Sequence, residues 1–142
     1  KLNCTKAYRL RGGNVLCLDA DNNKVSTYKS SGKKIKDFSG EFSNPVAASV
    51  NDQNVIIPDD EKIKIYKLDG KMRFEVGGLG DKDGQLDSPK GLFLEKDEIY
   101  VADTGNNRVQ IFSIDGIYLD KITNPSKQEN HIFNEPSRVV VD

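Results

Sequence analysis

One unit of sequence recurs three times along this chain, and the repeat limits the possible folds more than any other feature. Its clearest copy is IYVADTGNNRVQIFSIDG (99–116): an apolar run, a polar turn, then an alternating run that ends on an aromatic residue. The corresponding alternating runs end at Tyr28, Tyr66 and Phe112, at intervals of 38 and 46 residues. Units of this length are typical of repeat proteins, in which neighbouring units bury each other's apolar faces.

Two further markers keep the same phase. A glycine follows each aromatic residue by four positions, at Gly32, Gly70 and Gly116. An apolar residue stands three positions before each of three prolines, Pro45, Pro89 and Pro136. Together the markers predict units at about 1–39, 40–78 and 79–123, and the start of a fourth unit at 124–142.

Each unit contains four short segments that favour strands. In the third unit these are 91–94, 99–102, 108–112 and 118–122, which alternate or are rich in β-branched and aromatic residues. The turn at 115–116 is Asp-Gly, a strong hairpin signal. Four antiparallel strands in about 40–45 residues are typical of one blade of a propeller. The predicted fold is therefore all-β: a β-propeller segment of about three four-stranded blades and one further strand.

The segment GDKDGQLDSPKGLFLEKDEIYVADTGNNRVQIFSIDG (80–116) resembles an NHL repeat. It has the glycine-rich lead-in, the Pro-x-Gly step, the Tyr-Val-Ala-Asp-x-Gly-Asn-x-Arg turn and the final Asp-Gly of that pattern. The motif positions that carry the resemblance are Pro89, Gly91, Asp103, Gly105, Asn106, Arg108 and Gly116. The other units match more loosely, and the second has a shortened turn at 58–62.

The resemblance implies a β-propeller, commonly of six blades, that serves as a binding module. Many NHL domains belong to tripartite-motif ubiquitin ligases, where they select protein or RNA targets, and a few relatives are metal-dependent lyases. Six blades need about twice this length, and an open half-ring would leave apolar faces in water. We therefore expect either a piece of a longer chain, which we favour, or copies that associate to close the ring.

The turn at 103–108 reads as structural rather than catalytic. We expect Asp103 to accept hydrogen bonds from the backbone of the turn, in which Gly105 and Asn106 tolerate positive φ. We expect Arg108 to pack between blades, with its planar donor fork paired to a carboxylate. No catalytic residue is assigned.

The loops between second and third strands, and the links between units, hold more acidic than basic residues. RNA binding depends on basic residues that neutralise phosphates and on stacking aromatics, so this face suits a basic or neutral protein segment better. The candidate partner-binding residues are Asp59, Asp60, Glu61, Asp81, Asp83, Asn106 and Asn107. The predicted function is a non-catalytic interaction module, possibly the substrate-recognition part of a tripartite-motif-like ubiquitin ligase; an RNA-binding domain, or part of a lyase with ligands elsewhere, are the alternatives.

The remaining chemistry of the sequence is sparse. A single histidine, His131, cannot form the ligand cluster of a metal site, so we expect no metal and no cofactor. No apolar run is long enough to span a membrane. The two cysteines, Cys4 and Cys17, read as reduced thiols, which suits a cytoplasmic location, and the sequon at 3–5 is taken as chance.

Overall fold

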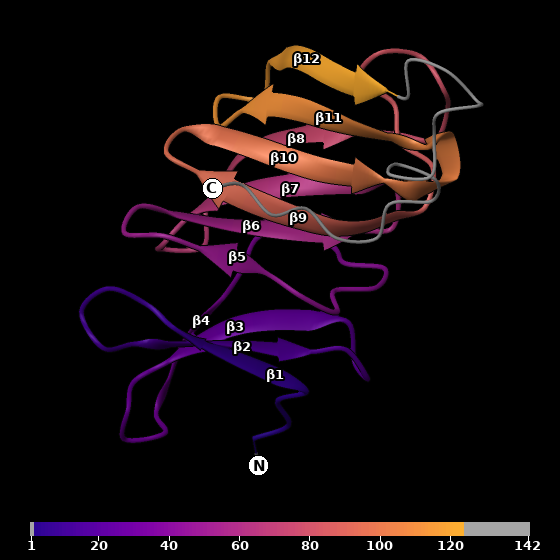
Figure 1. Cartoon of the computed structure of the whole chain (residues 1–142). Helices are drawn as coiled ribbons and strands as arrows, with labels where there is room; N and C mark the ends of the chain where they lie inside the picture. Colours follow the sequence, from indigo (N-terminus) through magenta and orange to yellow (C-terminus); the bar gives the residue numbers. More distant parts are fainter. Residues whose placement is uncertain (1, 124–142) are drawn as a thin grey trace. The chain divides into compact units, whose positions relative to one another are not determined.

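The computed structural model describes residues 2–123 and shows an all-β chain (Figure 1). Its strands form three four-stranded antiparallel sheets, which confirms the predicted fold class. Contacts divide the chain into two compact units, one ending at Glu75 and the other beginning at Val76, and each is described by itself. The predicted fourth unit at 124–142, with His131 and Pro136, lies outside the described residues.

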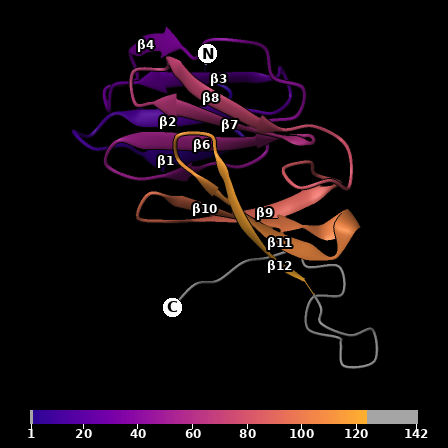
Figure 2. The same cartoon turned by 90° about the horizontal axis from the view of Figure 1, so that it is seen from above.

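The first two sheets follow chain order (Figure 2), and the middle residues of their central strands are buried. The first sheet consists of β1 (Lys6–Arg9), β2 (Val15–Asp19), β3 (Lys24–Tyr28) and β4 (Lys34–Asp37). The second consists of β5 (Ser49–Val50), β6 (Asn54–Asp59), β7 (Lys62–Lys67) and β8 (Met72–Gly77). Because both faces of β6 are covered, its residues 55–57 read as a continuous apolar run.

The third sheet also follows chain order, and it confirms the strands predicted for the third unit. It consists of β9 (Pro89–Glu95), β10 (Glu98–Asp103), β11 (Arg108–Ser113) and β12 (Tyr118–Thr123). A 3-10 turn, η1 (Thr104–Asn106), joins β10 to β11. Among the described residues, no helix has the length and apolar character of a membrane span.

In the compact unit that ends at Glu75, the core is centred on Tyr66 of β7. Its ring centroid lies 5.1 Å from that of Phe38 and 5.8 Å from that of Phe42, two residues on the link between the first and second sheets. The Tyr66 hydroxyl donates to the carbonyl oxygen of Ser39 at 2.9 Å. A Cβ on Gly70 would lie 2.8 Å from the Phe38 ring, so any side chain at this position would collide with Phe38. The link at 38–42 is therefore part of the core rather than a free loop.

The expectation of two reduced thiols is wrong, because Cys4 and Cys17 form a disulfide. Their Cα atoms are 5.3 Å apart, within the usual range for a disulfide. The reason lies in the pairing of β1 with β2: the backbone N–H of Thr5 donates to Leu18 at 2.8 Å, which brings the segment ahead of β1 against β2.

We expect the disulfide to stabilise the first sheet measurably. It closes a loop with a sequence separation of 13 residues, and a loop of that size corresponds to about 3 kcal/mol in the chain-entropy account. The Cys4→Ser/Cys17→Ser variant should therefore unfold at a lower urea concentration than the oxidised chain. Equal midpoints for the two, or free thiols in the native oxidised protein, would contradict the assignment.

Candidate binding site

The third sheet ends in a buried carboxylate that collects hydrogen bonds from three directions. Asp103, the last residue of β10, is fully buried. One carboxylate oxygen accepts the backbone N–H of Asp87 at 2.7 Å. The other accepts Nε of Arg108 at 2.7 Å, Nδ2 of Asn106 at 3.0 Å and Nε2 of Gln110 at 3.1 Å. Asp103 thus joins the turn, the next strand and the link that precedes the sheet.

Arg108 continues this network into the link at 80–88. Its Nη atoms donate to the carbonyl oxygens of Asp81 at 3.0 Å, Lys82 at 2.9 Å and Gln85 at 2.9 Å. The partner carboxylate Asp103 lies in the same sheet, paired with Arg108 in register. The guanidinium therefore holds the link over its own sheet by satisfying carbonyls that no strand pairs.

Gln110 takes part in the same network, and the sequence analysis did not single it out. Its side-chain oxygen accepts the N–H of Gly84 at 2.8 Å, and its nitrogen donates to Gln85 and Asp103. A polar residue at a fully buried position of β11 is the signal that could have found it, because buried amides need partners. Asn106 likewise donates to Gly80 at 2.8 Å, so its side chain is used internally.

Positive φ in this turn occurs at neither Gly105 nor Asn106, the two residues noted as tolerating it. Gly105 and Asn106 belong to the 3-10 turn η1, and Asn107 closes it in the left-handed region at φ 52°. Gly105 is required for another reason: its N–H donates to the carbonyl of Asp87 at 2.8 Å, and a Cβ there would lie 2.5 Å from Asp87 Cγ. Residues within a helical turn have negative φ, and only the residue that closes the turn enters the left-handed region. This explains why Asn107 has positive φ.

Asp59 in the second sheet repeats the arrangement with a different cation. It is buried and accepts the backbone N–H groups of Ser43 at 2.9 Å and Asn44, together with Nζ of Lys64 at 2.7 Å. Lys64 also donates to the carbonyl of Glu41. Asp59 therefore has no surface to offer a partner, and we assign it to the structural network instead of the partner-binding set.

The pKa of Asp59 lies below its ordinary value of 3.8. Burial of the carboxyl group acts in the opposite direction, but the hydrogen bonds from Lys64, Asn44 and Ser43 and the charge of Lys64 outweigh it. The network is thus built around an ionised carboxylate.

The first sheet has the same carboxylate position without a buried cation. Asp19 accepts the backbone N–H of Asn22 at 3.1 Å, its Nδ2 at 2.8 Å and Nδ2 of Asn3 at 2.9 Å. Lys24 occupies the register position that Arg108 occupies in the third sheet, yet it is exposed. This end of the first sheet is correspondingly open.

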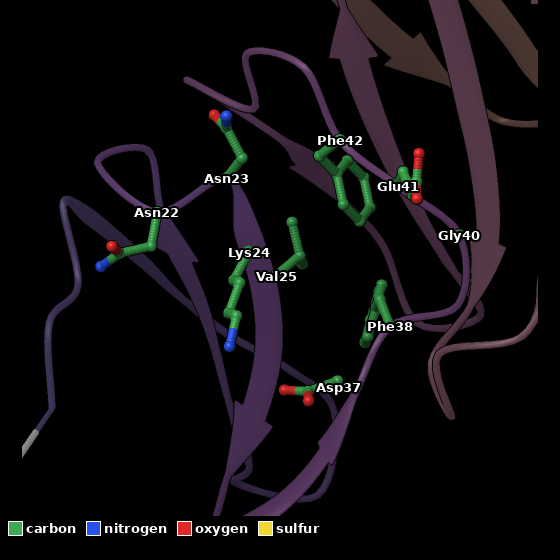
Figure 3. Close-up of a pocket in the computed structure, with 9 residues that line it drawn as sticks. All are labelled: Asn22, Asn23, Lys24, Val25, Asp37, Phe38, Gly40, Glu41 and Phe42. Atoms are coloured by element: carbon green, nitrogen blue, oxygen red, sulfur yellow. The ribbon is translucent and has the colours of Figure 1, made fainter.

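A pocket of about 350 Å³ lies beside Lys24 (Figure 3). One wall is the start of β3, at 22–25, and the other is the link at 37–42. Val25, Phe38 and Phe42 supply apolar side chains, whereas the rest of the lining is polar or charged apart from Gly40. The sequence alone does not predict this pocket, because the pocket depends on how the link packs against Tyr66.

The other predicted residues fall into two groups. Asp60, Asp81, Asp83 and Asn107 are exposed and Glu61 is half-buried, with Asp83 paired to Lys121 at 2.8 Å. The motif residues Pro89 and Gly91 belong to β9, where Gly91 lies opposite Ala102, and Gly116 has φ 84° in the β11–β12 turn. Within residues 2–123 no group of three His, Cys, Asp or Glu side chains is placed to hold a metal ion.

Asp59 should make the stability of the chain depend on acid. Because its folded pKa is depressed, its contribution is present above about pH 4 and is lost as the pH falls through the folded value. Asp59→Asn should lower the free energy of unfolding at pH 7 by about 3 kcal/mol, since Lys64 is left buried without its partner. It should also flatten the loss between pH 5 and 2, measured by urea unfolding. Asp60→Asn, at the exposed neighbour, is the matched control, and equal slopes in wild type and Asp59→Asn would contradict the assignment.

The ion pairs Arg108–Asp103 and Lys121–Asp83 should contribute very differently to the free energy of unfolding. Arg108→Lys removes the guanidinium donors of three link carbonyls and of the buried Asp103 carboxylate, and should cost about 2–3 kcal/mol. Lys121→Ala removes only an exposed pair with Asp83 and should cost less than about 0.5 kcal/mol. Chemical unfolding of both variants tests this order, and similar losses would show that Arg108 is not the main tether.

Comparison with known proteins agrees with this architecture. Residues 86–112 match the NHL repeat family. Over 87 residues, 61% of the chain, the sequence is 32% identical to the protein brain tumor of Drosophila melanogaster, of which this region is 8%. The chain therefore spans a small part of that relative.

Solved structures share the fold at low sequence identity. The WD40 domain of Neurospora crassa Pan2 has a TM-score of 0.66 and 11% identity, covering 96% of this chain and 40% of that chain. Hydrazine synthase of Kuenenia stuttgartiensis has a TM-score of 0.68 and 12% identity, covering 93% and 37%. These likenesses show the fold alone. With an NHL repeat at residues 86–112 and three four-stranded antiparallel sheets, residues 2–123 form part of a β-propeller.

Proposed function

We propose that this chain is a non-catalytic interaction module that recognises a protein partner. The contact would be made by the loop end of the compact unit that ends at Glu75. The loop end comprises the turns at 19–24 and 59–62 and the link at 38–44. The observation that carries the proposal is the pocket at this end, between the start of β3 and a link that is anchored in the core. Loops held in one conformation bind with a smaller loss of conformational entropy.

The charge of the loop end supports a basic or neutral protein segment. Asp21, Glu41 and Asp60 are exposed there. Of the two exposed lysines, Lys62 is 3.4 Å from the carboxylate of Glu75. A surface that binds RNA needs unpaired cations along its path, so RNA is the less favoured ligand.

The more specific form of the proposal is substrate recognition for a tripartite-motif-like ubiquitin ligase, and its support is the family resemblance. That role belongs in the cytoplasm, where thiols are kept reduced, whereas the Cys4–Cys17 disulfide favours an oxidising compartment. Thiol labelling of the native protein in its own cells separates the two: reduced cysteines support the ligase role, and an intact bridge counts against it.

The proposed function predicts selection of basic peptides by the full chain. Peptides from a random displayed library should be enriched in Arg and Lys. Asp60→Asn/Glu61→Gln should weaken their binding by about two- to fivefold per carboxylate, because exposed ion pairs contribute modestly. Asp52→Asn, in the β5–β6 turn at the opposite end of the second sheet, is the control and should bind as wild type does. Failure to enrich any peptide, or RNA binding that falls steeply with salt, would overturn the proposal.

A further inference from the structure

The pocket beside Lys24 has the chemistry of a site for one long side chain. Its volume of about 350 Å³ is near the lower limit of small-molecule sites, so it suits part of a ligand rather than a whole one. Phe38 and Phe42 line one wall of the pocket, and Val25 of β3 lines the other (Figure 3). Aromatic and apolar side chains of this kind can cover the aliphatic stem of an extended residue.

The lining of the pocket holds one cation, Lys24, and two carboxylates, Asp37 and Glu41. Figure 3 shows Lys24 extending toward Asp37. Asp37 also accepts Oγ of Ser26 and Nζ of Lys34, both at 2.6 Å, so it is already engaged. The carboxylate of Glu41, by contrast, has no ion-pair partner within the described part of the chain. Glu41 is thus the available anion of the lining.

We propose that this pocket takes a single arginine side chain of the protein partner. The stem would pack on the apolar lining and the guanidinium would pair with the Glu41 carboxylate. Arginine fits better than lysine because its planar group pairs with a carboxylate through two donors. This inference deepens the proposed function and rests on it.

The test uses Nα-acetyl-arginine amide as the probe and the neutral isostere Nα-acetyl-citrulline amide as its control. Both are titrated into the ¹⁵N-labelled full chain and followed by amide chemical shifts. The arginine probe should shift the amides of 22–25 and 38–42 along a saturating curve, and citrulline should bind at least about threefold more weakly. Glu41→Gln should weaken arginine binding by about two- to fivefold, and Asp52→Asn, in the β5–β6 turn and outside the pocket, should not.

The outcomes separate this inference from the proposed function. Equal binding of citrulline and arginine, or unchanged binding to Glu41→Gln, overturns the arginine site. Library peptides that are rich in basic residues but bind wild type and Glu41→Gln equally overturn the site and leave the proposed function standing. Saturating arginine binding without any selected peptide supports the site and counts against the proposed function.

Discussion

The second and third sheets both depend on one interaction at the end where their second strand meets the third. There the last residue of the second strand is a buried carboxylate. Asp59 accepts the backbone N–H groups of Ser43 and Asn44, and Asp103 accepts that of Asp87. These donors lie on links that have no strand to pair with, so no backbone ladder satisfies them. The carboxylate satisfies them, and it therefore fixes where each link enters its sheet.

A buried carboxylate in turn requires a cation, and the two sheets supply it differently. In the third sheet Arg108 stands directly opposite Asp103 in register. In the second sheet the corresponding residue is Lys62, which is exposed, and the cation comes from Lys64 two residues further along β7. The second unit departs from the repeat pattern at this turn, yet the same electrostatic requirement is met. The pairing of charges is thus better preserved within this chain than the residues that provide it.

The strands were predictable because their signals are local. Alternation, terminal aromatic residues and phased glycines located β9 to β12 within one or two residues. The site was not predictable, because it depends on which way each side chain points and on contacts between segments that are distant in the sequence. Asp59 and Asp60 look alike as adjacent acids, but a shift of one residue turns a side chain from the core to solvent. The disulfide and the need for glycine at Gly105 arise from segments 13 and 18 residues away in the chain.

Amide hydrogen exchange tests most directly whether buried carboxylates hold the links in place. The N–H groups of Ser43, Asn44 and Asp87 lie outside strands and donate to carboxylates alone, whereas Lys96, in the β9–β10 turn, provides a comparison. The account predicts that the first three exchange as slowly as amides in the centres of β6 and β10. Exchange at the rate of the Lys96 amide would show that the links open freely and would contradict it.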